Sequence, residues 1–258
     1  METDTVLIQN DSGVLTITLD RPKANAFTTE MAKALTKTFK DAGRDNDVRV
    51  VLLTGTGRMF SAGQDVGEFG DSGERSFRAH LQATFNPMIL AMRNLEKPII
   101  GAINGAVAGA SLGIALACDL RIAADTARFV VGFLGIGLAP DSAVSLLLPT
   151  LIGLGRAAEA VFTNEAIDPE KALAWGLVNR VVPADDLQAA AAEWAATLAR
   201  GPIHAMGLAK RDFNRAVLPN VAEVLDYEAH NQEIAGKRAE HKEGVAAFRE
   251  KREPKYTT

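Results

Sequence analysis

The chain has 258 residues, 28 Lys and Arg against 32 Asp and Glu, and a formal net charge of −4. This length can bury a large core in one domain, and the charge disfavours a dedicated nucleic-acid binder. Cys118 is the only cysteine, which excludes an intrachain disulfide and fits the reducing cytosol. Because the first residues lack the basic and apolar regions of a secretory signal, we expect a cytoplasmic protein.

The first half of the sequence alternates strand and helix patterns. Residues 14–19 alternate as a strand does, and Thr28 then begins a helix that ends near Gly43. A charge-free β-branched run from Val50 predicts a buried strand. Further along, the pattern predicts one helix with apolar positions Leu81, Phe85, Ile89, Met92 and Leu95, and strands at 99–103, 120–124 and 129–131. This order predicts an α/β fold.

From residue 140 onward the patterns are mostly helical. An alanine-rich helix over 185–200 is followed by a break at Gly201-Pro202 and by three more helices. We therefore expect an α/β core over residues 1–195 and a helical region over 196–258. Residues 98–118 carry no charge, but their four glycines favour a strand and a tightly packed helix over a membrane span.

Two strand exits are rich in small residues. Residues 61–63 read Ser-Ala-Gly and precede Gln64 and Asp65, and the second exit covers residues 105–113. Small residues let backbone N–H groups approach a ligand closely. The two exits together predict a site in which backbone N–H groups bind an anion or a carbonyl oxygen. The alternative is that both are tight structural turns.

Three further motifs allow more than one interpretation. Residues 153–158 match G-x-G-x-x-A, but Pro149 occupies the strand that a dinucleotide site needs, so a helix–helix turn is favoured. Residues 109–113 match G-x-S-x-G and would make Ser111 a nucleophile with Asp141 and His204, although residues 104–108 separate this motif from its strand. Asp141, in an apolar stretch, is either a helix N-cap or a desolvated base. The four histidines show no metal-ligand spacing, so no metal site is predicted.

Taken together, five segments resemble the crotonase superfamily, also called the enoyl-CoA hydratase/isomerase superfamily. They are Leu-Asp-Arg-Pro at 19–22 with Asn25-Ala26, residues 60–65, residues 103–110, residues 174–183 and the tail 243–252. The resemblance implies a spiral of ββα units, similar to ClpP, with a C-terminal helical region that builds trimers or hexamers. It implies an acyl-CoA substrate and no cofactor besides that coenzyme A.

The resemblance also assigns roles to individual residues. It implies an oxyanion hole made by the backbone N–H groups of Gln64 and Ala110. Contacts to coenzyme A or to the acyl group would come from Lys23, Ala62, Gly63, Asp65, Gly109, Phe133, Phe248 and Lys251. The two tail contacts, Phe248 and Lys251, would come from this chain or from a neighbouring subunit.

Two departures from the family pattern bear on the reaction. Hydratases of the family carry glutamates at the positions of Gly113 and Phe133, and both are missing here. The remaining acid is Asp141, in a setting that resembles the ring-epoxide isomerases of phenylacetate degradation. The resemblance implies an isomerase that shifts a double bond or expands a ring epoxide. The alternatives are a hydratase with a depleted acid/base set and a non-catalytic acyl-CoA-binding scaffold.

Overall fold

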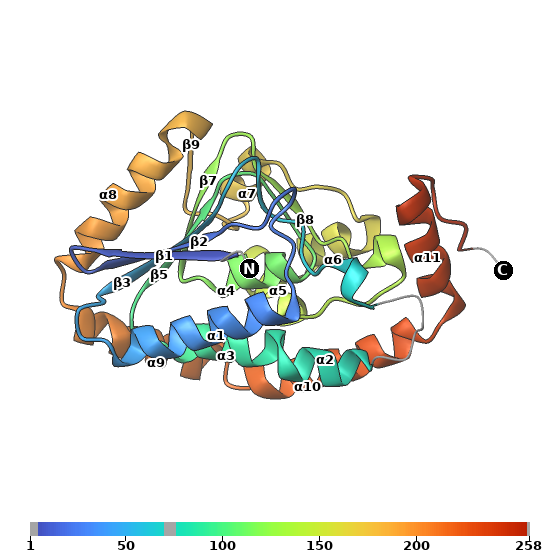
Figure 1. Ribbon diagram of the computed structural model, residues 1–258, viewed down its shortest axis with the longest axis horizontal. Helices are drawn as coiled ribbons and strands as arrows, with labels where there is room; N and C mark the ends of the chain where they lie inside the picture. Colours follow the sequence, from blue (N-terminus) through green and yellow to red (C-terminus); the bar gives the residue numbers. More distant parts are fainter. Residues whose placement is uncertain (1–4, 70–75, 257–258) are drawn as a thin grey trace.

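The computed structural model describes residues 5–69 and 76–256 and centres on a six-stranded sheet (Figure 1). In spatial order its strands are β1 (Val6–Asp11), β2 (Val14–Leu19), β3 (Val50–Gly55), β5 (Ile99–Ile103), β7 (Leu120–Ala124) and β9 (Arg180–Val182). Only the β1–β2 pair is antiparallel. The central strands therefore share one edge at their carboxyl ends.

A second, three-stranded parallel sheet consists of β4 (Met59–Ser61), β6 (Ala106–Ala108) and β8 (Arg128–Val130). Each of its strands follows a strand of the main sheet along the chain: β4 follows β3, β6 follows β5 and β8 follows β7. Helices then return the chain to the main sheet. This repeat of two strands and a helical return confirms the predicted spiral of ββα units.

The main sheet is covered on both faces, which explains why β3 is buried at every position. Val51 and Leu53 pack into the larger core cluster, whereas Val50 and Leu52 pack into a smaller one with helix α8 (Leu187–Ala199). Figure 1 shows α8 on one side of the sheet and α1 (Thr29–Arg44) on the other. A strand buried on both faces reads as a continuous apolar run, as the sequence predicted.

The helix expected around Leu81 to Leu95 is in fact two helices, so the prediction of one helix is wrong. They are α2 (Phe77–Ala83) and α3 (Phe85–Asn94), which meet at Thr84. Pro87 lies in the first turn of α3, where its missing N–H needs no partner. In a continuous helix its ring would clash with the carbonyl group of Ala83, four residues earlier.

The remaining helices follow the sequence prediction, and β1, β4, β6 and β9 are strands that the sequence reading did not identify. The helices are α4 (Ala110–Ala117), α5 (Val144–Ile152), α6 (Leu154–Thr163), α7 (Pro169–Ala174), α9 (Ile203–Val217), α10 (Val221–Gly236) and α11 (Ala239–Glu250). Short 3₁₀ helices are η1 (Val66–Phe69), η2 (Leu134–Ile136) and η3 (Ala184–Asp186). Within the described ranges, no helix combines the length and the apolar character that crossing a membrane requires.

Candidate active site

A cavity of about 510 Å³ lies where the two strand exits meet η2, α10 and α11. Of the residues predicted for the site, it is lined by Ala62, Gln64, Gly109, Ala110, Phe133, Asp141 and Phe248. These residues come from segments that are far apart in the sequence. The fold thus brings both small-residue turns and the candidate base to one cavity.

Among the described residues, the backbone N–H group of Gln64 has no main-chain acceptor. Gln64 forms an isolated parallel bridge with Phe27, in which Phe27 N donates to Gly63 O at 2.8 Å and Asp65 N donates to Phe27 O at 2.9 Å. In such a bridge the residue between the two bonded groups turns its own N–H to the opposite side. The bridge therefore directs the N–H group of Gln64 away from Phe27.

The amide of Ala110 lies close to this turn because Gly63 has no side chain. A Cβ on Gly63 would lie 2.6 Å from the backbone oxygen of Ala108 and 3.4 Å from the amide nitrogen of Ala110. Ala110 begins helix α4, and its N-cap Gly109 has φ 58° and ψ −133°, a conformation that favours glycine. The first N–H groups of a helix have no partner within the helix and carry its positive dipole end. Two amide groups of this kind, without a partner among the described residues, can bind a carbonyl oxygen.

Asp141 is a buried carboxylate in the same cavity, with 6% of its surface exposed. Ser142 Oγ donates to Asp141 Oδ1 at 2.8 Å, and Gln232 Nε2 donates to Asp141 Oδ2 at 2.6 Å. Burial raises the pKa of Asp141 to about 6, and the two donors oppose this rise. A carboxyl group with this pKa can both take and return a proton near neutral pH.

The side chain of Asp141 does not act as a helix N-cap. Helix α5 begins at Val144, its N-cap is Ala143, and no side chain of this turn caps it. The Asp141 backbone oxygen accepts from Val144 N at 3.0 Å, while its carboxylate is engaged by Ser142 and Gln232. The carboxylate of Asp141 is therefore hydrogen-bonded to side chains and does not cap α5.

The space that a hydratase glutamate would use at Gly113 is filled by the turn after Asp141. A Cβ on Gly113 would lie 2.2 Å from the backbone oxygen of Ser142 and 2.7 Å from its Cβ. Phe133, at the other glutamate position, is buried and lines the cavity. Of these two positions, Phe133 gives the cavity an apolar wall, and Gly113 packs against the turn.

Lys23, Gly63, Asp65 and Lys251 do not line the cavity. Lys23 and Lys251 are exposed residues with left-handed backbone, at φ 83° and 55°. Asp65 forms an ion pair with Arg21 at 2.7 Å, which ties the first exit to the loop after β2. Their predicted contacts with coenzyme A therefore stay predictions.

Several cavity residues were not identified from the sequence. Gln232, Phe77, Leu81 and Arg252 all line the cavity. Leu81 was assigned to helix packing, Phe77 received no predicted role, and Gln232 lies in a helix with no local motif. Arg252 stands beside the predicted Lys251 and forms ion pairs with Glu243 and Glu250.

The G-x-S-x-G motif is structural. Ser111 is fully buried, its Oγ accepts from Ala108 N at 3.1 Å, and it lies 2.8 Å from the acceptor Ser61 O. His204 is exposed on α9. Gly153 separates α5 from α6, as the helix–helix turn predicted.

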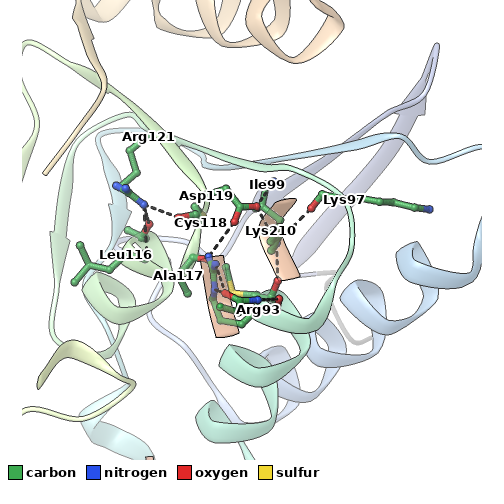
Figure 2. Close-up of polar contacts among 12 residues, drawn as sticks. Arg93, Lys97, Ile99, Leu116, Ala117, Cys118, Asp119, Arg121 and Lys210 are labelled. Atoms are coloured by element: carbon green, nitrogen blue, oxygen red, sulfur yellow. Dashed lines mark hydrogen bonds and ion pairs between the residues drawn. The ribbon is translucent and has the colours of Figure 1, made fainter. Parts of the chain in front are cut away.

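The far end of α4 is held by buried cations (Figure 2). The guanidinium group of Arg121 donates to the backbone oxygens of Leu116 and Cys118 at 3.2 and 2.6 Å, and Arg93 donates to Ala117 O at 3.0 Å. Asp119 pairs with Arg93 and with Lys210 at 3.0 and 2.8 Å. Cations stabilise the negative end of a helix dipole, so the buried arginines stabilise the C-terminus of α4 while its N-terminus lies at the cavity.

Within the described ranges, no group of three or more His, Cys, Asp or Glu side chains is arranged to hold a metal ion.

Comparison with known proteins places the whole chain in one family. The family described as "Enoyl-CoA hydratase/isomerase" matches residues 9–258. The chain is 37% identical to 1,2-epoxyphenylacetyl-CoA isomerase of Escherichia coli K12 over 98% of both chains. It is 33% identical to trans-2-decenoyl-[acyl-carrier-protein] isomerase of Streptococcus mutans, over 100% of this chain and 99% of the relative. An enoyl-CoA hydratase structure from Mycobacterium avium subsp. paratuberculosis superposes with a TM-score of 0.90 at 30% identity, covering 98% of this chain and 99% of that one. The chain belongs to the enoyl-CoA hydratase/isomerase family, the crotonases.

Proposed function

We propose that this protein is an acyl-CoA isomerase that shifts a carbon–carbon double bond next to a thioester, with Asp141 as its single acid and base. The observation that supports this proposal is that the cavity has one buried carboxylate. Among the described residues that line it, the carboxylates are Asp141 and Glu253, and Glu253 is exposed in the C-terminal tail. Asp141 is the buried one.

The thioester oxygen would lie between the N–H groups of Gln64 and Ala110. Negative charge moves onto this oxygen when the neighbouring carbon loses a proton, so both hydrogen bonds strengthen in the transition state. Losing one such donor costs roughly 3–4 kcal/mol in other oxyanion holes. The N-terminus of α4 adds its positive dipole end.

Asp141 would carry the proton between two carbons of the acyl group. Its carboxylate takes a proton from C2 of a 3-enoyl thioester, and the C2–H electron pair becomes a dienolate with charge on the thioester oxygen. The protonated Asp141 then returns the proton to C4, and the double bond lies between C2 and C3. The carboxylate is regenerated, so one acid is sufficient.

The apolar walls would keep water away from this reaction. Phe133 and Leu138 are buried beside the candidate base, and Gly113 offers no group to activate water. Hydration requires one group to deprotonate water and another to deliver a proton. The Escherichia coli relative is named as an isomerase of an epoxide substrate. Ring opening and expansion of such an epoxide by this protein would use the same oxyanion hole.

The decisive test compares the wild type with Asp141→Asn on a 3-enoyl-CoA and on a 2-enoyl-CoA. We expect isomerisation by the wild type, little hydration, and loss of isomerisation in the variant with unchanged affinity for the CoA ester. Asp47→Asn is the matched control, because Asp47 is exposed before β3, at the opposite end of that strand from the cavity.

Each alternative gives a different result in this assay. Hydration as fast as isomerisation would favour the depleted hydratase. Binding of the ester without turnover by the wild type would favour the non-catalytic scaffold. Unchanged turnover in Asp141→Asn would remove Asp141 as the base.

A further inference from the structure

Helix α10 directs two buried polar side chains at the segment that carries Asp141. Glu228 and Gln232 are four residues apart, so they lie on the same face of the helix, and they are 3% and 1% exposed. Both contact the segment from Asp141 to Ser145. Buried polar groups are costly unless they are paired, so this concentration on one face calls for an explanation.

Glu228 stabilises the turn between Asp141 and α5. Its carboxylate accepts from Ala143 N at 2.8 Å, from Ser145 N at 3.0 Å and from Ser145 Oγ. Ser142 and Ala143 both have left-handed backbone, at φ 55° and 64°, which is unfavourable for residues with a side chain. The N-cap Ala143 has no capping side chain, so the Glu228 carboxylate, from another helix, accepts the hydrogen bonds that such a side chain would accept at the start of α5.

Gln232 acts on the carboxylate itself. Its Nε2 donates to Asp141 Oδ2 at 2.6 Å, and its Oε1 is buried without a partner among the described residues. A bond to an ionised carboxylate is about twice as strong as one between neutral groups, so this donor favours the ionised form. Rotation of the amide group by half a turn would let Oε1 accept from the protonated carboxyl group, so glutamine can bond to Asp141 in both states.

We propose that α10 positions Asp141 through these two side chains: Gln232 holds the carboxylate directly, and Glu228 fixes the turn that carries it. This inference rests on the proposed role of Asp141 as the base. It assigns Gln232 and Glu228 as positioning residues, since neither is required to touch the reacting carbons.

Few other ionisable groups face Asp141. Helices α4 and α5 and the 3₁₀ helix η2, which surround it, carry none. On α2 and in the tail, three ionisable groups near the cavity have other contacts: Arg78 with Asp226, His80 with Gln64, and Arg252 with Glu243 and Glu250. Glu253, which also lines the cavity, is exposed. On α10, Glu228 faces the turn, and burial together with the nearby charge of Asp141 raises the pKa of Glu228 to about 7. The other ionisable side chains of α10 are exposed or half-buried: Glu223, Asp226, Tyr227, His230 and Glu233.

The test of Gln232 is the pH dependence of isomerisation. In Gln232→Leu we expect the acidic limb of the kcat/KM profile to move upward by about one to two pH units, because the ionised carboxylate loses a charge-assisted donor. Turnover should recover part of its loss at alkaline pH. Asn231→Leu is the matched control, since Asn231 is the next amide along α10 and does not line the cavity. An acidic limb that stays in place in Gln232→Leu would overturn the role of Gln232.

The test of Glu228 is a separation of kcat from KM. Glu228→Gln keeps the shape of the side chain but replaces one of its two accepting oxygens with an NH₂ group, so either Ala143 N or Ser145 N loses its acceptor. We expect kcat to fall at least tenfold with little change in KM, because the amides of Gln64 and Ala110 are untouched. If this variant does not fold, Glu228→Asp, with its shorter reach, gives the same comparison. Equal loss in kcat and in thioester affinity would overturn the role of Glu228.

A measurement without turnover separates this inference from the proposed function. The carboxyl stretch of Asp141, assigned by infrared difference against Asp141→Asn, reports its protonation directly. An upward shift of this titration in Gln232→Leu supports the positioning role even if the reaction is not isomerisation. An unshifted titration with normal isomerisation in the wild type would contradict the positioning role alone.

Discussion

The chemistry of Asp141 depends on an opposition between burial and hydrogen bonding. Burial raises the pKa of this carboxyl to about 6, and the donors Gln232 and Ser142 limit the rise. The base must be ionised to take a proton from the substrate. We therefore expect isomerisation to be weak well below pH 6 and to rise as the pH passes through about 6. A kcat/KM profile of the wild type measures this, and a profile flat across this range would contradict it.

The same burial predicts a stability cost for the active residue. The folded-state pKa lies above the unfolded value, so the stability that this group contributes is present at acidic pH and is lost as the pH rises through about 6. Asp141→Asn should therefore raise the free energy of unfolding at pH 8 by about 1–3 kcal/mol. Urea unfolding of both proteins measures this, and the gain should vanish near pH 4. A variant less stable than the wild type at pH 8 would oppose this account.

Residues of the site differ in how far the sequence could reveal them. An acid in a long apolar stretch singled out Asp141, and small residues marked the two turns that hold Gln64 and Ala110. The roles of these three residues came from the family resemblance. Gln232 was not recognisable, because its partner is 91 residues away and a glutamine within a helix carries no signal of its own. Contacts that depend on tertiary packing leave no local pattern.

At the scale of elements, α4 is the helix whose two ends matter most. Its N-terminus faces the cavity, and its last carbonyl groups accept from Arg121 and Arg93. Arg121 is buried, and burial lowers its pKa from the usual arginine value. Its side chain replaces water as the donor for this end of the helix.

Arg121→Leu should lower the free energy of unfolding by at least about 2 kcal/mol, because each buried carbonyl left without a donor costs about 1–3 kcal/mol. Arg180→Leu is the control: Arg180 stacks on the ring of Trp194 at 3.9 Å, and its loss should cost about 0.5–1 kcal/mol. Denaturant unfolding compares the two. Equal losses would show that the carbonyl contacts of Arg121 contribute little.

The wrong prediction at this scale, one helix in place of α2 and α3, has a clear cause. Apolar spacing continued through Thr84, so periodicity alone showed no boundary. Pro87 marked the break, but a proline in the first turn starts a helix as readily as it ends one. The short strands β4, β6 and β9 were missed for a related reason, since three residues are too few to show alternation.

At the scale of the whole molecule, the α/β spiral followed from the order of strand and helix patterns together with the family resemblance. The division at residue 195 stays a prediction, and both parts of the chain line the cavity, because α10 supplies Gln232 and α11 supplies Phe248. The helical region therefore completes the candidate site, and its role in assembly remains a prediction.

Large apolar side chains exposed on the later helices suggest how that prediction can be tested. Phe162 on α6, Phe213 and Val217 on α9 and Tyr227 on α10 are more than half exposed. We expect sedimentation equilibrium to give three or six times the 27.5 kDa of one chain. Phe213→Glu should shift the distribution toward single chains. A wild type that sediments as one chain at micromolar concentration would contradict the assembly.

The turn from Asp141 to Ala143 also limits how this protein could be converted to the activity of a hydratase. Because the backbone of Ser142 occupies the volume beside Gly113, glutamate cannot be introduced there by a single codon change without displacing the turn. A laboratory conversion to a hydratase would have to transplant the turn and the facing positions of α10 as one block. If these residues change together in evolution, the reaction changes with them. A protein variant that carries only part of the block would lose one activity before it gains the other.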